Sequence, residues 1–322
     1  MPPRMAVIGA TGFIGSHLTE LLVRGGAEVL AIARSERRLA NLASVTGHCR
    51  FELADILDPG RMRTVLAGFQ PEAVFHLAAD IDAEESFQHA TASIQSNAIG
   101  TVNVLEASAK SGAAVLVYAD SCKVYGNGPV PYREAQPDAP LCSYAIGKAA
   151  GWRLCQLASA MTGMAVCSLR STFVYGPRQN PNLITHVCDC VRRGVPVRLL
   201  GGSQTRDLLY VADAVRAYAA AAANPAAWGR AVPIGGGHEI DVVHLCQEIL
   251  SVLGSSIDVV AGAHEPRLTE IWRSYCDNME AAEAFKWSPQ VGLREGLTRT
   301  LLGDLPVSLP AEPSHASPLA TP

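Results

Sequence analysis

The chain has 322 residues, of which 48% are hydrophobic and 17% are charged. This is the composition of an ordinary globular protein and lies far from the low-hydrophobicity, high-charge range of disordered chains. The 26 basic and 30 acidic residues give a formal net charge of −4 without long runs of either sign, which argues against nucleic acid as a partner. The length allows one large domain or two modest ones.

Export signals, membrane spans and metal sites are not expected from the sequence. The first residues, MPPRMAVIGATGFIG, pass directly into an expected strand, and no apolar run reaches membrane-spanning length. The nine cysteines form no C-x-x-C pair and no Cys/His ladder, so we expect no metal ligands among them. We therefore expect a cytoplasmic protein without a membrane partner, whose cysteines are mostly small buried residues.

Short apolar strands alternate with amphipathic helices through the first half of the chain. The expected strands are 5–8, 28–33, 50–53, 73–77, 114–118 and 165–170, and the expected helices are 13–24, 59–69, one ending near Lys110 and one beginning at Tyr144. Such alternation requires parallel strands joined by right-handed crossovers, with helices on both faces of the sheet. The sequence therefore predicts an α/β fold with a doubly wound parallel (Rossmann) sheet.

The second half is less regular. Gly and Pro punctuate residues 175–181 and 194–202, which is typical of loops and short strands. We expect a dinucleotide-binding domain over 1–170, whose sheet resumes within 206–236 at strands near 208–210 and 231–234. A smaller α/β substrate-binding cap is expected from 171–205 and 237–301. Residues 302–322, rich in Pro, Ser and Ala, are expected to form a flexible tail.

A glycine-rich turn, GATGFIG, follows the first expected strand and opens the first helix. Glycines here permit a tight turn and a close approach of the backbone to a pyrophosphate, while the N–H groups at the helix start face the anion. The alternative is a glycine-rich turn without a ligand, but the position between first strand and first helix favours the cofactor. The turn residues expected to bind it are Gly9, Thr11, Gly12, Phe13, Ile14 and Gly15.

The end of the second expected strand indicates which dinucleotide binds. No acidic residue stands there to accept the ribose hydroxyls of NAD, and the chain continues into Arg34-Ser35-Glu36-Arg37-Arg38. A guanidinium and a hydroxyl at this place suit a 2′-phosphate, so we expect NADP, with NAD as the alternative. Asp55, after the third strand, is placed to contact the adenine.

Three residues form a candidate catalytic group. Tyr144 and Lys148 lie four residues apart on one face at the start of a helix, where the ammonium is expected to lower the pKa of the phenol and make it a base. Lys148 can also hold the nicotinamide ribose. Ser121 follows the strand ending at Tyr118 and is expected at the carboxyl edge of the sheet, where it orients the substrate alcohol.

With these motifs in place, the chain resembles the extended short-chain dehydrogenase/reductases, the NAD-dependent epimerase/dehydratase family of nucleotide-sugar enzymes. The resemblance covers residues 6–301. It rests on GATGFIG, Asp55, HLAA at 76–79, Asn97 in NAIGTVNVLEAS, VYG at 124–126, the Tyr144/Lys148 pair, YGPRQ at 175–179, RDLLYV at 206–211 and WSP at 287–289.

This resemblance implies a set of site residues. It makes Ser121, Tyr144 and Lys148 the catalytic triad, and it implies a homodimer formed through the helices near 91–110 and 144–160. For the two arginines thought to clamp the diphosphate, Arg206 and Arg267, a structural salt bridge is the alternative. Phe173 departs from the family, which usually has Asn there. Further cofactor residues are Ile56, Leu77, Ala78, Ala79 and Asn97; further substrate residues are Glu84, Phe173, Arg178 and Asn182.

The reaction depends on Cys122 and Lys123, which are expected to face the same pocket as Ser121. By resemblance, many 4,6-dehydratases carry Asp-Glu at these places and others carry Asp-Lys, whereas this chain has Cys-Lys. A desolvated Lys123 would be the C5 base, and Cys122 would protonate the leaving hydroxyl. The alternative is that Cys122 only packs and Lys123 only contacts phosphate or solvent.

Three functions follow from these observations. The first is an epimerase or dehydratase that acts through transient oxidation at the sugar C4. The second is an NADPH-dependent reductase of a nucleotide-linked keto-sugar, which the Arg34 segment favours. The third is a dinucleotide-sensing protein without catalysis, against which the intact Ser121, Tyr144 and Lys148 argue.

Overall fold

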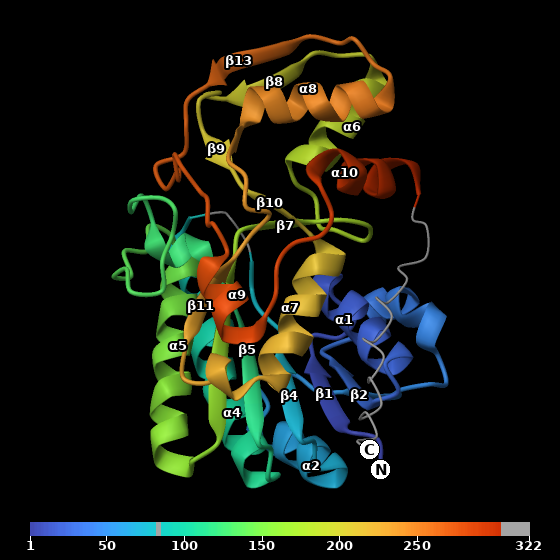
Figure 1. The fold of residues 1–322 in the computed structure, drawn as a ribbon, viewed down its shortest axis with the longest axis vertical. Coiled ribbons are helices and arrows are strands. Elements are labelled where there is room, and N and C mark those ends of the chain that lie inside the picture. Colours follow the sequence, from blue (N-terminus) through green and yellow to red (C-terminus); the bar gives the residue numbers. More distant parts are fainter. Residues whose placement is uncertain (82–84, 304–322) are drawn as a thin grey trace, which may run out of the picture.

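A seven-stranded parallel sheet forms the centre of the larger part of the molecule (Figure 1). The structure is a computed structural model that describes residues 1–81 and 85–303. The strand order is β11-β6-β5-β4-β1-β2-β3, so the chain winds outward from β1 in both directions. This confirms the doubly wound α/β fold. The strands are β1 Arg4–Ile8, β2 Glu28–Ala33, β3 Arg50–Leu53, β4 Ala73–His76, β5 Val115–Ser121, β6 Ala165–Ser171 and β11 Ala231–Ile234.

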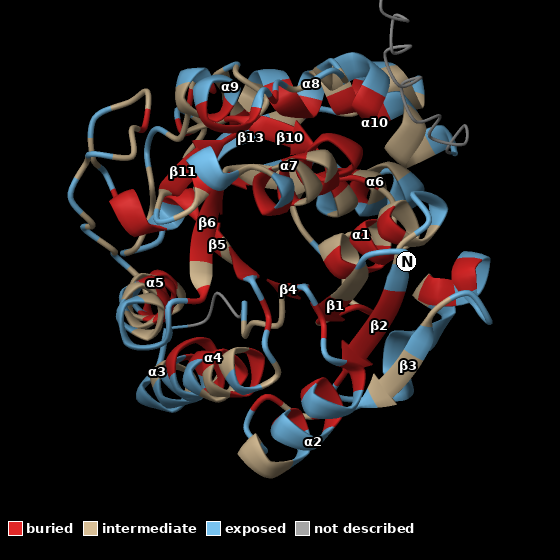
Figure 2. Ribbon diagram, turned by 60° about the horizontal axis from the view of Figure 1, so that its bottom comes forward, coloured by how far each residue is buried: buried red, intermediate tan, exposed pale blue. Residues whose placement is uncertain are grey.

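Helices cover both faces of this sheet (Figure 2). Along β5, Val115 and Val117 belong to one buried apolar cluster, and Leu116 and Tyr118 belong to the cluster on the opposite face. This alternation follows from the two-residue period of a strand and explains why its sequence is apolar throughout. One face carries α1 Phe13–Arg24, α7 Val211–Ala223 and α9 Met279–Phe285; the other carries α2 Pro59–Phe69, α4 Gly100–Lys110 and α5 Ser143–Thr162.

The helix expected to end near Lys110 is assembled from three pieces. It consists of α3 Phe87–Ile94, a π-helical segment η2 Gln95–Ile99, and α4. Short π-helical segments inside helices are often found at functional sites. Three further short 3₁₀ segments are η1 Glu36–Val45, η3 Cys122–Tyr125 and η4 Pro225–Ala227.

A smaller region sits above the carboxyl ends of the sheet strands in Figure 1. It has its own apolar core, to which Val187, Leu199, Leu245 and Ile249 contribute. Its elements are β7 Phe173–Tyr175, α6 Leu183–Arg193, β8 Val197–Leu200, β9 Thr205–Arg206, β10 Leu208–Tyr210, β12 Ile240–Asp241, α8 Val242–Leu253, β13 Val259–His264 and α10 Leu293–Leu302.

One expected strand of the main sheet lies elsewhere. Residues 208–210 form β10, but β10 pairs with β7 in a separate two-stranded sheet. The edge of the main sheet beside β6 is taken by β11, whose residues 231–234 pair with 168–171. The prediction was therefore right for 231–234 and wrong for the sheet to which 208–210 belong.

The expected tail falls almost entirely outside the described residues. Leu302 ends α10 and Gly303 follows it, while 304–322 are not described. Within the described part of the chain, no helix combines the length and the hydropathy needed to cross a bilayer.

Candidate active site

The turn between β1 and α1 is tight enough to require glycine. Gly9 has a φ of +91°, and a Cβ on Gly15 would lie 2.1 Å from the Gly9 carbonyl oxygen. The N-cap of α1 is Gly12, which has no side chain to cap the first N–H groups of the helix. The N–H groups of the first turn are thus left to a ligand, as a pyrophosphate requires. This cradle fits a dinucleotide, and it places the expected residues from Gly9 to Gly15 together.

The expected adenosine-binding residues gather at the neighbouring strand ends. Arg34 follows β2 and is exposed, and Asp55 follows the adjacent strand β3. Asp55 accepts a hydrogen bond from the Leu57 backbone at 2.9 Å, which stabilises the turn. Ile56 is buried against Gly100, where a Cβ would meet its side chain at 2.6 Å.

Asn97 anchors the chain that follows β4. Its side-chain amide donates to the Asp80 carbonyl at 2.9 Å and to Ser93 Oγ at 3.0 Å, and its Oδ1 accepts from the Asp80 backbone at 3.0 Å. These bonds fix the position of the preceding segment, Leu77 to Ala79, beside the glycine turn. A Cβ on Gly9 would come within 2.8 Å of the Ala78 backbone nitrogen.

Ser121, Tyr144 and Lys148 come together at the carboxyl edge of the sheet. Ser121 is the last residue of β5, and the other two lie at the start of α5. The Ser121 side chain lies close enough to Tyr144 to act on the pKa of its phenol. Lys148 Nζ is buried, lies 4.5 Å from the centre of the Tyr118 ring, and has no hydrogen-bond partner among the described residues. A buried ammonium of this kind fits the hydroxyls of a bound ribose.

The electrostatics of the pair differ from the expectation in one respect. Burial raises the pKa of Tyr144, and the negative charge of Asp120 adds to this, while the Ser121 side chain acts in the opposite direction. The expected lowering of this pKa by Lys148 is therefore not found in the protein alone, where burial and Asp120 determine the direction of the shift. Burial also lowers the pKa of Lys148 to about 8, an effect that Asp120 partly offsets.

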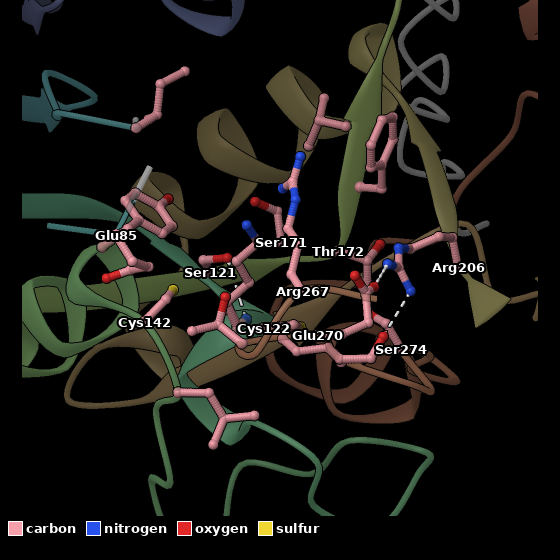
Figure 3. Close-up of a pocket in the computed structure, with 18 residues that line it drawn as sticks. Glu85, Ser121, Cys122, Cys142, Ser171, Thr172, Arg206, Arg267, Glu270 and Ser274 are labelled. Atoms are coloured by element: carbon pink, nitrogen blue, oxygen red, sulfur yellow. Dashed lines mark hydrogen bonds and ion pairs between the residues drawn. The ribbon is translucent and has the colours of Figure 1, made fainter. Parts of the chain in front are cut away.

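A cavity of about 340 Å³ opens in front of these residues (Figure 3). Its walls come from the end of β5, the start of α5, the β6–β7 connection and the segment 267–274. The cavity thus lies between the large sheet and the smaller region. Of the expected catalytic and substrate residues, those that line it are Ser121, Cys122, Lys123, Tyr144, Phe173, Arg206 and Arg267.

Arg206 is held by protein groups at the cavity wall (Figure 3). Its guanidinium forms an ion pair with Glu270 and donates to the carbonyls of Thr205 at 2.7 Å and Ile271 at 2.8 Å. The Arg206 side chain is 24% exposed and lines the cavity, so it remains accessible from there. Both the anion-clamp role and the structural salt bridge expected for Arg206 are compatible with this placement. Arg267 lies on the same wall.

Two expected substrate residues lie outside the cavity lining. The Arg178 guanidinium is paired with Glu20 on α1 at 2.9 Å and contacts His17 and the Asn41 carbonyl. Asn182 caps α6 by accepting hydrogen bonds from the backbones of Ile184 and Thr185. Arg178 thus links the smaller region to α1, and Asn182 stabilises the start of α6 within the smaller region. Glu84, the remaining one, lies outside the described residues.

Cys122 and Lys123 differ in their surroundings. The Cys122 thiol donates to the Arg170 carbonyl at 3.0 Å, and burial raises its pKa well above the usual range. It also packs against Val124, Tyr125 and Tyr132, which favours the packing role over the acid role. Lys123 is exposed, with its Nζ 5.7 Å from the centre of the Tyr144 ring.

Three polar residues of this site were missed from the sequence. Glu85 lines the cavity and accepts hydrogen bonds from the Ser143 backbone and hydroxyl, directly before Tyr144. Glu270 lines it beside Arg206. Asp120 lies buried behind Ser121. For Asp120 a signal existed, since an acidic residue inside an apolar strand is rare and demands a partner.

Comparisons with known proteins identify the family of the chain. The profile of the NAD dependent epimerase/dehydratase family matches residues 5–235. A UDP-glucose 4-epimerase of Mycolicibacterium smegmatis is 34% identical over 308 residues, covering 92% of this chain and 97% of that protein. A dTDP-glucose 4,6-dehydratase of Streptomyces niveus is 32% identical over 313 residues, covering 92% and 91% of the two chains.

A solved structure extends the likeness to three dimensions. The UDP-glucuronic acid 4-epimerase from Bacillus cereus, in complex with UDP-glucuronic acid and NAD, superposes with a TM-score of 0.86 at 25% identity. The alignment covers 92% of this chain and 97% of that one. The fold, the glycine cradle, the Ser121/Tyr144/Lys148 group and these matches lead to one conclusion: the chain belongs to the NAD dependent epimerase/dehydratase family of enzymes.

Proposed function

We propose that this enzyme acts on a nucleotide-linked hexose and oxidises its C4 transiently, as a 4-epimerase. The observation that carries the proposal is the shared cavity. Ser121 and Tyr144 line one wall, and Arg206 and Arg267 line another. A sugar carbon placed at the phenol and a diphosphate placed at the guanidiniums are both accommodated in such a cavity.

The residues divide the work as follows. Tyr144 takes the proton from the C4 hydroxyl and later returns it, and Ser121 holds that hydroxyl in line with the phenol. Lys148, buried beneath them, holds the ribose of the cofactor and contributes positive charge. The nicotinamide dinucleotide, when bound in the glycine cradle, supplies the redox chemistry and a further positive charge that favours the phenolate.

Among reactions of this class, epimerisation fits the described cavity better than dehydration. Elimination needs an acid and a base near C5 and C6, and the Cys122 thiol is committed to the Arg170 carbonyl. The lining carboxylates are committed too, Glu85 to Ser143 and Glu270 to Arg206. Dehydration is the second candidate, because Lys123 lies on the cavity wall near the Tyr144 ring.

The test is incubation of the purified protein with UDP-, GDP-, CDP- and dTDP-hexoses, first with catalytic cofactor and then with NADPH. A new sugar of unchanged mass by NMR supports the 4-epimerase. A product lighter by one water establishes dehydration, and Cys122→Ala and Lys123→Ala are then compared. Turnover only with consumption of NADPH identifies a reductase, and cofactor binding without any turnover favours a sensing protein.

For the cofactor we propose NADP over NAD, on the strength of Arg34. This guanidinium is exposed at the end of β2, where the 2′-position of the adenosine ribose is expected. Arg34→Leu is expected to weaken NADP binding by roughly tenfold, the size of one charge-assisted pair, and to leave NAD binding nearly unchanged. Fluorescence titration with both cofactors measures this, with Arg193→Leu on α6 as the charge-matched control. Equal losses for both cofactors would contradict the assignment.

We also propose that two copies of the chain associate through the outer faces of α4 and α5. Large apolar side chains are exposed there: Val102 at 41%, Leu157 at 56% and Met161 at 74%. Burying such a surface is favourable by about 25 cal/mol per Å² of apolar area. Sedimentation velocity is expected to give the mass of a dimer, and a monomer at micromolar concentration would contradict this proposal.

A further inference from the structure

A buried ion pair lies directly behind the catalytic triad. Asp120 immediately precedes Ser121 on β5, and its register partner on β6 is Arg170. The Arg170 Nε and the Asp120 Oδ2 are 3.1 Å apart, and the two side chains are 3% and 0% exposed respectively. Charges are rarely buried so completely in a sheet, because desolvation costs more than an average pair returns.

Among the described residues, the side-chain and backbone partners of the Asp120 carboxylate are hydrogen-bond donors. The Ser121 backbone N–H donates to Oδ1 at 2.8 Å, and Ser168 Oγ donates to Oδ2 at 3.0 Å, next to the Arg170 bond. Burial raises the pKa of Asp120, while Arg170, Lys148 and these donors act against that rise. A site built from donors alone suits the ionised carboxylate.

Two further residues contact the Arg170 side of the ion pair. Arg170 reaches Asp138 at 2.8 Å, and its guanidinium lies 4.7 Å from the centre of the Tyr125 ring. This second carboxylate and the ring surround Arg170 and restrict the position of its guanidinium. The negative charge of Asp120 is consequently fixed in position close to Ser121.

We propose that Asp120 is a positioning residue for the catalytic triad, orienting the Ser121 backbone and supplying a fixed negative charge that acts on both Tyr144 and Lys148. This inference rests on the proposed function for the roles of those two residues. Asp120 raises the pKa of Tyr144 and also that of Lys148, since a negative charge favours the protonated form of every neighbour. It thereby keeps Lys148 charged despite burial and keeps Tyr144 protonated until the cofactor binds.

Other groups around these residues do not supply the same charge. His76 on β4 has its pKa lowered to about 3 by burial, so it is neutral near pH 7. The neighbouring thiols and phenols have pKa values raised by burial and are also neutral: Tyr118, Cys122, Cys155 and Tyr218. Cys142 and the exposed ammonium of Lys123 face Tyr144 from the cavity side. Asp120 thus stands as the buried negative charge that faces Lys148 among the described residues.

The pH profile of Asp120→Asn tests the proposal. In the cofactor-bound enzyme, where the positive charge of the cofactor favours the phenolate, activity requires a deprotonated Tyr144 and a protonated Lys148. The acidic limb of the profile then reports the pKa of Tyr144, and the alkaline limb reports that of Lys148. Without the negative charge of Asp120, the pKa values of both Tyr144 and Lys148 are expected to fall. Both limbs of the bell-shaped pH–activity profile are therefore expected to move to lower pH. Ser168→Ala removes one donor and keeps the charge, so its profile is expected to stay in place. A lower maximum at the same pH would mean a purely structural role and would overturn the proposal.

A second measurement does not depend on activity. The chain has four lysines, Lys110, Lys123, Lys148 and Lys286, so a ¹³Cε-lysine NMR titration yields four signals that Lys→Arg variants assign. The Lys148 midpoint is expected at lower pH in Asp120→Asn than in the wild type. Should this variant fold poorly because Arg170 loses its partner, Asp120→Asn/Arg170→Gln removes both charges. The Lys148 midpoint is then expected to move in the same direction by a smaller amount, because loss of the Arg170 charge favours protonated Lys148.

The two measurements separate the inference from the function on which it rests. An active enzyme whose Lys148 midpoint and pH profile stay unmoved in both variants would overturn the role of Asp120 and leave the proposed function intact. If the wild type is inactive but the Lys148 midpoint still differs between the wild type and Asp120→Asn, the proposed function is contradicted and Asp120 is supported as the source of the charge.

Discussion

Tyr144→Phe is expected to lower kcat by roughly 10²–10⁴-fold, the usual contribution of a positioned acid–base group. The phenol lines the cavity together with Ser121 and is the acid–base group that we assign to the C4 hydroxyl. Its ring is expected to stay in place in the variant, so the dissociation constant of the cofactor and the melting temperature should change little. Steady-state turnover together with a cofactor titration measures both quantities.

Tyr275→Phe is the matched control for this variant. It removes a hydroxyl from a half-buried tyrosine that does not line the cavity, and it is expected to keep wild-type turnover. A Tyr144→Phe enzyme that keeps kcat within about threefold of the wild type would show that the phenol carries no proton, against an expected effect of at least about 100-fold.

Gly15→Ala is expected to have the largest effect on cofactor binding. The new Cβ would lie 2.1 Å from the Gly9 carbonyl oxygen and 3.1 Å from the Ala10 Cα, and both are backbone atoms that cannot turn aside. The turn must therefore open, which costs about 1–3 kcal/mol of folding stability as overpacking usually does. Because the same turn forms the pyrophosphate cradle, cofactor affinity is expected to fall at least about tenfold.

Gly68→Ala in α2 is the control, because a Cβ there meets no heavy atom within 4 Å. Alanine in a helix is favoured over glycine by about 0.5–1 kcal/mol, so this variant is expected to melt slightly higher than the wild type. Thermal unfolding with and without cofactor compares the two. Wild-type cofactor affinity in Gly15→Ala would mean that the dinucleotide does not use this turn.

The fold of the first half could be predicted from local patterns. The helices at 13–24 and 59–69 and the strands at 28–33 and 50–53 have the bounds expected from the sequence. Their periodicity is strong because β2 is buried on both faces of the sheet and each helix packs one apolar face against it, whereas β3 at the sheet edge is only half-buried. The glycine turn was recognisable for a similar reason, since its requirement for glycine is set by neighbouring backbone atoms.

What could not be predicted depends on contacts distant in sequence. Residues 208–210 look like a sheet strand locally, but 231–234 occupy the place beside β6. Arg178 resembles an anion ligand until the fold places Glu20 against it. The pKa of Tyr144 was expected to be lowered by Lys148, yet burial and Asp120 raise it. Each of these outcomes is set by burial or by a partner that a local pattern does not contain.

Transient oxidation at C4 is tested most directly with the nucleotide sugar that the substrate panel identifies, deuterated at C4 and incubated in ordinary water with catalytic cofactor. We expect turnover with the deuterium retained in the product and no net consumption of cofactor, because the atom removed from C4 returns to the same molecule. Loss of deuterium to water, or turnover that consumes the cofactor one for one, would contradict it.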